Sequence, residues 1–472
     1  VLGGRSVGPW LTAFAYGTSY FSPVVFVGYA GQFGYKYGLA STWIGIGNAV
    51  LGSLVAWVVL GRRTRIMSKH LGSMTMPDFF GKRYDSQSLR IAASVIAFIF
   101  LIPYTASVYN GLSYLFGMAF DVDFRICVVV MAVLTGVYVI IGGYMATAWN
   151  DLIQGIIMLF GIVAVIAAVL SGHGGFMAAV KELAQVPSSV MPGAYASFLG
   201  PDPANLFGVV ILTSLGTWGL PQMIQKFYAI KDEKAVHTGT IISTLFAIVV
   251  SGGCYFLGGF SRISGVKEAV DGTVKYDTII PTMLSSLPDI LIGIVIVLVL
   301  SASMSTLSSL VLTSSSTLTL DFIKPLFVKK MNEKQQLVWM RVLLAGFILI
   351  SVVIALDPPA FIAQLMGISW GALAGAFLAP FLYGLYWKGV TRAAVWASFI
   401  CGVGITVANM FFRFIASPIN AGAFAMVAGL VIVPVVSLIS PKLKKETVED
   451  VFHCLEEKVM VEQKLALPEE EE

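Results

Sequence analysis

Apolar stretches of about 20 residues, the length an α-helix needs to cross the hydrocarbon core of a bilayer, follow one another along almost the whole chain. A transmembrane β-barrel would instead show short segments of alternating hydrophobicity. The pattern therefore predicts an all-α polytopic membrane protein. We expect twelve membrane spans, at residues 7–32, 41–61, 89–118, 122–142, 147–171, 204–228, 236–262, 288–320, 334–356, 360–388, 391–416 and 421–441.

Two of these spans are interrupted by glycine, proline and polar residues. Span one reads AYGTSYFSP at 15–23, and span six reads TSLGTWGLPQ at 213–222. Proline inside a helix removes a backbone hydrogen bond and clashes with the preceding turn, so each segment alone is equally consistent with a simple kink. The two segments lie five spans apart, however. Interrupted helices at matching positions of two halves are typical of inverted-repeat transporters.

Span eight carries a track of hydroxyl side chains through an otherwise apolar sequence. Ala302, Ser305, Thr306 and Ser309 are spaced so that they share one face of a helix. Hydroxyl and carbonyl oxygens suit a hard cation such as Na+, but small hydroxyl residues also let transmembrane helices pack closely. Both interpretations stay open for the full track, which consists of Ser301, Ser303, Ser305, Thr306, Ser308, Ser309, Thr313, Ser314, Ser315 and Ser316.

Composition and charge support the membrane prediction and give it an orientation. Hydrophobic residues make up 57% of the chain and charged residues 12%, whereas a soluble domain has about 25% charged residues. If the Val1 end is cytoplasmic, cytoplasmic segments hold 23 of the 30 Lys and Arg residues. This bias follows the positive-inside rule. We therefore expect a multi-pass protein of the plasma (inner) membrane with the Val1 end and the C-terminal tail both cytoplasmic.

Asp151 stands at the start of span five, in the segment ATAWNDLIQG. An acid at a helix N-terminus is often only a favourable partner of the helix dipole. Ionisable residues within membranes are, however, usually functional. Asp151 is therefore a candidate for the inner mouth of a cation path. Asp289 and Asp321, at the two ends of span eight, look like boundary or capping residues.

The residue patterns of enzymes are absent from the sequence. The four cysteines and four histidines are scattered, and no CxxC, HExxH, Walker loop or Ser/His/Asp set occurs. We therefore predict that the protein is not an enzyme and has no cofactor. The expected partners are Na+, which would be both the coupling ion and the only bound metal, a small-molecule solute and the lipid bilayer. No nucleic acid is expected as a partner.

Five segments together resemble the sodium/solute symporter family, which includes bacterial sodium/proline and sodium/pantothenate symporters. They are GGRSVGPWLTA (3–13), GGYMATAWNDLIQG (142–155), LGTWGLPQ (215–222), SASMSTLSSLVLTSSS (301–316) and PFLYGLYWKGVTRAA (380–394). The resemblance implies a leucine-transporter-type fold with two inverted repeats of five helices, broken helices one and six, and two extra C-terminal helices. The corresponding division is a transporter domain at 1–441 and a polar cytoplasmic tail at 442–472, with repeat one at 7–171, repeat two at 204–388 and the extra helices at 391–441.

The resemblance also implies a Na+ site between spans one and eight. Carried over by motif, the site uses the carbonyl oxygens of Thr18, Phe21 and Ala302 and the hydroxyls of Ser305 and Thr306. Asp151 matches an acid associated with the release of Na+ to the cytoplasm. For the solute, Tyr104 matches an aromatic residue of the substrate region, and Trp218 and Pro221 match the unwound part of span six.

The proposed solute pocket departs from that of the proline symporters. Tyr20 replaces an aspartate, Pro23 replaces a glycine, and Thr213 and Thr217 replace a Trp and a Tyr. A pocket with more hydroxyls results, lined also by Ser19 and Ser22. No arginine stands within either break.

We therefore expect sodium-coupled symport of a small organic solute, an amino acid or an organic acid, into the cell by alternating access. Two alternatives stay open. One is a proton-coupled symporter of the same fold, with Asp151 as the proton carrier. The other is a non-transporting membrane sensor, although the tail after Pro441 is too short for a signalling domain.

Overall fold

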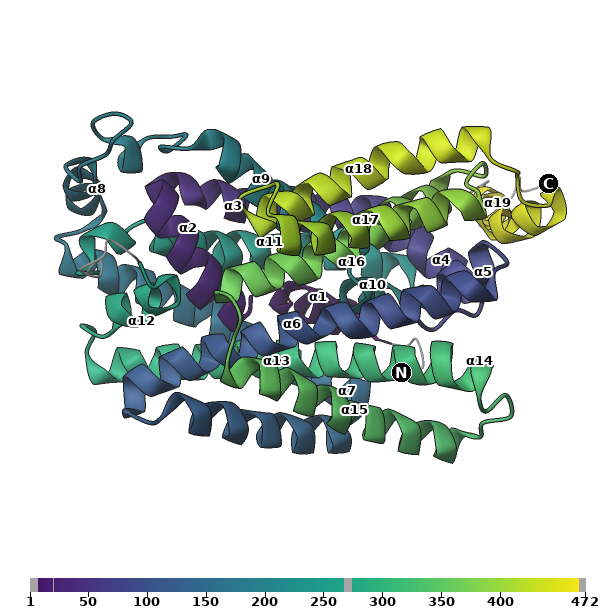
Figure 1. The fold of residues 1–472 in the computed structure, drawn as a ribbon, viewed down its shortest axis with the longest axis horizontal. Helices are drawn as coiled ribbons and strands as arrows, with labels where there is room; N and C mark the ends of the chain where they lie inside the picture. The colour runs from purple at the N-terminus through teal and green to yellow at the C-terminus, as the bar shows by residue number, and fades with distance from the viewer. Residues whose placement is uncertain (1–6, 20, 267–273, 467–472) are drawn as a thin grey trace, which may run out of the picture.

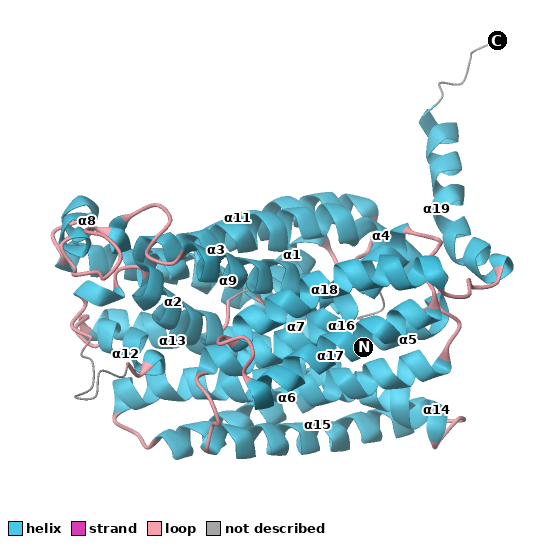
Figure 2. Cartoon of the chain, turned by 45° about the horizontal axis from the view of Figure 1, so that its top comes forward, coloured by secondary structure: helices cyan, strands magenta, loops and turns pink. Residues whose placement is uncertain are grey.

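The computed structural model describes residues 7–19, 21–266 and 274–466, and α-helices dominate these ranges (Figure 2). The β-type pairing in the described ranges is a single bridge between Val7 and Ile230. The first half of the chain forms α1 (Pro9–Thr18), α2 (Ala30–Tyr37), α3 (Thr42–Gly47), α4 (Arg62–His70), α5 (Met76–Arg83), α6 (Gln87–Phe120), α7 (Phe124–Gly172), α8 (Phe176–Ala184), α9 (Pro203–Leu215) and α10 (Pro221–Tyr228).

The second half of the chain is equally helical. It forms α11 (Glu233–Gly258), α12 (Ile279–Leu284), α13 (Asp289–Leu318), α14 (Lys324–Leu326), α15 (Glu333–Leu356), α16 (Ile362–Tyr386), α17 (Arg392–Phe412), α18 (Pro418–Ile439) and α19 (Lys445–Ala466). Wider π-turns occur in three of the spans: η2 (Val24–Tyr29) in span one, η4 (Asn48–Val55) and η5 (Trp57–Gly61) in span two, and η10 (Thr319–Ile323) at the end of span eight. Short 3-10 helices lie at η3 (Gly38–Ser41), η6 (Ala194–Ala196), η7 (Gly216–Gly219), η8 (Ser261–Ile263) and η9 (Tyr276–Thr278).

Among the described residues, nine helical stretches are long and apolar enough to cross a bilayer, and ten if α9 to α10 count as one bent span. One of the nine, Val24–His70, contains both the second half of expected span one and all of span two. Phe124–Val137, within expected span four, is a shorter apolar stretch. The prediction of an all-α polytopic membrane protein is confirmed.

The helix boundaries differ from the expected ones at two places. Helix α7 continues through the loop expected at 143–146, because no proline stands there and Gly142 and Gly143 weaken a helix without ending it. Span two runs on into the polar helix α4 instead of ending at Gly61.

The interruptions of spans one and six are both present. Helix α1 ends at Thr18, the chain is not helical at Phe21 and Ser22, and helix resumes at Pro23. In span six, η7 is followed by Leu220 in an extended conformation, and α10 starts at Pro221 with a bend of 46°. Proline suits this first helical position because its missing N–H has no partner there in any case. The prediction of broken helices one and six is confirmed.

The helices lie roughly along one long axis, with two distinct ends (Figure 1). We call them the α8 end, where α8 and α12 lie, and the α5 end, where α4, α5, α14 and α19 lie. The first half of span one, α1, lies in the middle of the bundle and packs against α11 and α7. Helix α13, which carries the hydroxyl track, packs against α7 and α6. The break in span one therefore lies among the core helices.

The crossing of α2 and α11 depends on glycine. A Cβ atom on Gly34 would lie 2.1 Å from the carbonyl oxygen of Gly258, and one on Gly258 would lie 2.2 Å from the carbonyl oxygen of Ala30. Small residues let transmembrane backbones approach closely enough for dispersion contacts along the whole crossing. The second half of span one is thereby held directly against span seven.

We expect Gly258→Ala to lower the free energy of unfolding by about 3 kcal/mol, since a rigid backbone carbonyl cannot move away from the added methyl group. Gly346→Ala is the matched control, because Gly346 lies within α15 and a Cβ there would meet nothing within 4 Å. Thermal unfolding of the purified variants measures both effects. Equal midpoints for the two variants would contradict the close crossing.

Candidate functional site

The C-terminal end of α1 meets the hydroxyl track of α13. The Ser305 hydroxyl donates a hydrogen bond of 3.0 Å to the Thr18 hydroxyl, and both side chains are buried. Thr306 is buried beside Ser305, and its hydroxyl has no hydrogen-bond partner among the described residues. A buried, unpartnered hydroxyl costs free energy, so this arrangement leaves oxygen atoms ready for a ligand.

The end of α1 brings backbone oxygens to the same region. The last carbonyls of a helix have no partner within the helix. The Thr18 carbonyl accepts a hydrogen bond of 3.2 Å from the Phe21 N–H, within the break. Ala302 lies one turn before Ser305 on α13 and is fully buried. The structure thus places the five residues expected to bind Na+ on two adjoining segments.

Asp151 lies against this meeting point. It is 3% exposed, and its carboxylate neighbours Ser305, whose hydroxyl proton is donated to Thr18. One turn further along α7, a Cβ on Gly155 would lie 2.3 Å from the Phe14 ring and 3.2 Å from Thr18. This glycine allows α7 to pass close to α1, which brings Asp151 near the end of α1.

The structure adds Lys226, which the sequence analysis did not single out. Lys226 is 4% exposed, lies within α10, and its Nζ is 3.8 Å from Oδ2 of Asp151. The signal in the sequence was a cation four residues after Gln222, still inside the expected span.

A second group of buried polar side chains lies at the break of span one. Tyr104, from α6, neighbours Ser22, and both side chains are buried. The Tyr104 ring packs edge to face against Trp370 of α16, with the ring centroids 5.9 Å apart. The indole N–H of Trp370 has no partner in the described part of the chain. Trp370 was not expected from the sequence, where it is one aromatic residue among small ones.

The other residues expected to bind the solute use their polar atoms within the protein. The Ser19 and Thr213 hydroxyls donate to carbonyls of their own helices, at Ala15 and Val209, over 2.9 Å each. The Trp218 indole donates to the Leu51 carbonyl of span two over 3.0 Å. Pro221 is buried at the start of α10, and Tyr20 lies outside the described residues.

Span two joins the two broken helices through one carbonyl oxygen. The Gly52 carbonyl accepts hydrogen bonds from the Tyr16 hydroxyl of α1, at 2.9 Å, and from the Thr217 hydroxyl of η7, at 3.3 Å. Hydrogen bonds between transmembrane helices hold them in register. The two breaks are therefore connected to each other through η4.

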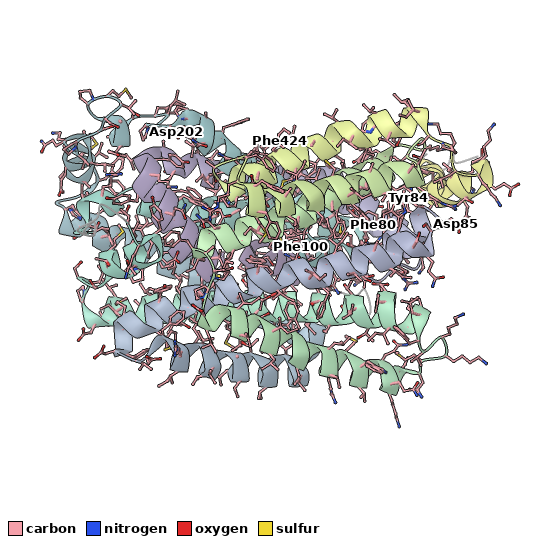
Figure 3. All side chains as sticks on the ribbon, in the orientation of Figure 1. Phe80, Tyr84, Asp85, Phe100, Asp202 and Phe424 are labelled. Carbon is pink, nitrogen blue, oxygen red and sulfur yellow. The ribbon has the colours of Figure 1, made fainter. Side chains whose placement is uncertain are left out.

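A cavity of about 650 Å³ opens at the α8 end, where Figure 3 shows Asp202. It is lined by α2, by α9 and the segment before it, by the start of α16 and by residues 415–420, where α18 begins. Its lining carries charges of both signs and several amides: Gln32, Lys36, Asp202, Asn205, Gln364 and Asn420.

The comparisons with known proteins bear on this arrangement directly. The model of the sodium:solute symporter family matches residues 1–402. The chain belongs to the sodium:solute symporter family. The sodium/proline symporter of Staphylococcus aureus is 28% identical to this symporter over 458 residues, which are 94% of this chain and 87% of the relative.

Solved structures show the fold of this symporter. A Na+-coupled sialic acid symporter in a substrate-bound outward-open state matches with a TM-score of 0.72 and 16% identity, over 94% of this chain and 92% of that one. Mhp1, a nucleobase-cation-symport-1 family transporter in a closed conformation, matches with a TM-score of 0.58 and 14% identity, over 95% of this chain and 97% of that one. The expected leucine-transporter-type fold is confirmed, and the symporter is a sodium-coupled transporter rather than an enzyme.

An acidic side chain outside the membrane spans caps one of the core helices. Asp277, in η9, accepts a hydrogen bond of 3.2 Å from the N–H of Ile362, the first residue of α16. Burial raises the pKa of the Asp277 carboxyl to about 7, and the hydrogen bond from Ile362 opposes this shift. The same helix carries Trp370, so this cap helps to position the site.

We expect the stability of the symporter to fall as the pH rises from about 4 to 7, by on the order of 3 kcal/mol from this carboxyl alone. The sign follows because the folded protein holds the Asp277 proton more tightly than the unfolded chain, whose carboxyl has an ordinary pKa. Asp277→Asn keeps an acceptor for the Ile362 N–H and removes the titration. Unfolding midpoints of wild type and variant measured across this range should diverge toward pH 7, and parallel curves would exclude Asp277 as the cause.

Proposed function

We propose that this symporter carries a small polar organic solute, an amino acid or an organic acid, into the cell together with Na+. The observation that supports this most is the buried contact between Ser305 and Thr18 beside the unpartnered hydroxyl of Thr306. Na+ is bound by oxygen atoms, as hard cations are. In the proposed site these are the carbonyls of Thr18, Phe21 and Ala302 and the two hydroxyls of α13.

In this proposal, Na+ passes Asp151 when it leaves the site for the cytoplasm. The Asp151 carboxylate is buried next to Ser305, on the side of α10, which runs toward the α5 end. We propose that an ion leaving Ser305 and Thr306 toward that end passes Asp151, which contacts Lys226 of α10. We therefore assign Asp151 to the release path of Na+ and leave it out of the ligand set itself.

The solute site in this proposal lies between the span-one break and the aromatic pair of Tyr104 and Trp370. Ser22 and Tyr104 supply hydroxyls, Trp370 supplies an N–H donor, and the two rings offer apolar walls. The start of α10 at Pro221 presents the positive end of a half-helix, which suits a carboxylate. Ser19, Thr213, Thr217 and Trp218 then shape the two breaks around the solute.

We assign the α8 end to the outside and the α5 end to the cytoplasm, in a plasma membrane. The basic helix α4 lies at the α5 end (Figure 1), as expected for a cytoplasmic segment. The large polar cavity at the α8 end then serves solute entry. Na+ moving inward through 100 mV gains about 2.3 kcal/mol per charge, which corresponds to roughly fifty-fold accumulation of a co-transported neutral solute.

A thermal-shift screen tests the proposal. Amino acids, organic acids, sugars and vitamins are added to purified symporter in NaCl and in choline chloride. We expect an amino acid or organic acid that stabilises the protein in NaCl only, by about 2.7 kcal/mol at a hundred times its Kd. The same solute is then tested for uptake into proteoliposomes. Uptake driven by a pH gradient without Na+ would favour the proton-coupled alternative, and binding without uptake would favour the sensor.

A further inference from the structure

Lys226 and Asp151 form an ion pair inside the membrane-spanning core. Their side chains are 5% and 4% exposed, and Nζ lies 3.8 Å from Oδ2. Removing two charges from water costs several kcal/mol per ion, and charged residues at membrane depth are rare for this reason. Such a pair is weak evidence for a purely stabilising role, because apolar residues of similar size would cost less.

The Asp151 carboxylate neighbours both this fixed cation and Ser305, a proposed ligand of the mobile one. Oδ2 lies 3.8 Å from the Lys226 ammonium, and the carboxylate also neighbours Ser305, whose hydroxyl donates to Thr18. Oδ1 of Asp151 has no hydrogen-bond partner among the described residues, and neither has the Thr306 hydroxyl. The carboxylate therefore has one oxygen near the lysine and one oxygen left for another donor or cation.

We propose that Lys226 is a tethered counter-ion that competes with Na+ for Asp151. This inference rests on the proposed Na+ site at Ser305 and Thr306. When Na+ occupies those oxygens, its charge partly satisfies Asp151, and the ammonium is repelled. When Na+ leaves past Asp151, the ammonium of Lys226 takes over the carboxylate. Lys226 thereby lowers the affinity for Na+ at the release step and leaves the empty carrier without an unpaired buried anion.

The contacts of Lys226 and its neighbour connect α10 to two other core helices, α7 and α13. Lys226 lies on α10, the second half of the broken span six, whereas Asp151 lies on α7. The preceding residue, Gln225, accepts a hydrogen bond of 2.8 Å from Thr313 of α13. Helix α10 is therefore tied to α13 by a neutral bond and to α7 by a charged one. Bound Na+ weakens the ion pair between Lys226 and Asp151 and leaves the hydrogen bond between Thr313 and Gln225 unchanged.

If Lys226 only positioned Asp151, its removal would change the affinity for Na+ in the opposite direction. If the lysine only held Asp151 in a position suited to Na+, its removal would weaken Na+ binding. If it competes with Na+, its removal leaves Asp151 as an uncompensated anion and strengthens Na+ binding. Two unit charges a few ångströms apart in a protein interact strongly enough to shift an affinity by about tenfold or more.

Binding of radioactive Na+ to the purified full-length symporter, with no solute present, measures this effect. We expect Lys226→Met to lower the Kd for Na+ by about tenfold or more, and Lys226→Arg to stay near wild type because it keeps the charge. Lys231→Met is the matched control, since Lys231 is exposed just beyond α10. A Kd for Lys226→Met that is unchanged or higher, or an equal shift in Lys231→Met, overturns the competition.

A second comparison keeps the inference testable if Lys226→Met folds poorly. In an Asp151→Asn background the pair is already neutralised on one side, so adding Lys226→Met should change the Kd for Na+ far less than it does alone. An equal decrease in both backgrounds would mean that Lys226 does not act through Asp151. If wild type itself shows no saturable Na+ binding, the proposed Na+ site fails, whereas normal wild-type binding with no lysine effect removes only this inference.

Discussion

Ser305→Ala and Thr306→Ala are each expected to lower Na+-dependent solute uptake by about tenfold or more, because a hydrogen-bond-type contact to a charged group is worth roughly 1.5–3 kcal/mol. The fold should hardly change. The Thr306 hydroxyl has no partner among the described residues, and Ser305 loses one hydrogen bond, to Thr18, worth about 1 kcal/mol. Initial uptake rates in proteoliposomes at several Na+ concentrations measure the effect, which should be a rise in the Na+ concentration for half-maximal uptake.

Ser303→Ala is the matched control for both variants. Ser303 is a fully buried hydroxyl residue of the same helix, but its hydroxyl donates to the Val299 carbonyl over 2.7 Å. Its removal should leave the Na+ dependence of uptake unchanged. If both Ser305→Ala and Thr306→Ala transport like wild type and still need Na+, the ion binds elsewhere.

Arg90→Met is expected to lower the free energy of unfolding by about 3–5 kcal/mol, the usual cost of leaving a buried charge without its partner. Asp321 is fully buried at the α5 end, and its Oδ1 lies 2.8 Å from Nε of Arg90. Arg90 also lies 3.2 Å from Asp78, and Thr75 hydrogen-bonds Asp321. The arginine thus joins α5, α6 and η10, so its loss should loosen the end of the span that carries the hydroxyl track. Unfolding midpoints of the purified protein report the change.

Arg392→Met is a matched control at the same end of the molecule, where Figure 3 shows Asp85. Arg392 lies 2.8 Å from Asp85, the same distance as in the buried pair, but the side chains are 49% and 66% exposed. An exposed ion pair contributes about 0–1 kcal/mol because water and salt screen it. Similar losses for Arg90→Met and Arg392→Met would show that burial does not set the strength of these pairs.

The fold was largely predictable because membranes impose simple rules on sequence. Long apolar stretches must be helices, since lipid offers no hydrogen bonds to the backbone. The breaks in spans one and six could be found from glycine and proline, which act locally. The end of span two and the continuity of α7 could not be found in the same way, because no local residue forces a helix to stop at the membrane surface.

The site was predictable only in part, because its remaining features depend on distant partners. Asp321 looked like a boundary or capping residue, but the helix continues past it through η10 and α14, and its side chain is fully buried against Arg90. Trp370 and Lys226 acquire their roles from helices far away in the sequence. Span two could not be connected with the site from its sequence, because the feature that matters there is the backbone carbonyl of Gly52.

The central proposal is that Na+ binds between the end of α1 and the hydroxyl track of α13. An experimental structure of the symporter in NaCl, at a resolution that shows bound ions, tests it most directly. It should show an ion in contact with the hydroxyls of Ser305 and Thr306 and with the Thr18 and Ala302 carbonyls, and this ion should be missing in choline chloride. An ion bound elsewhere in NaCl, with the Ser305 hydroxyl still on Thr18, would contradict the proposal.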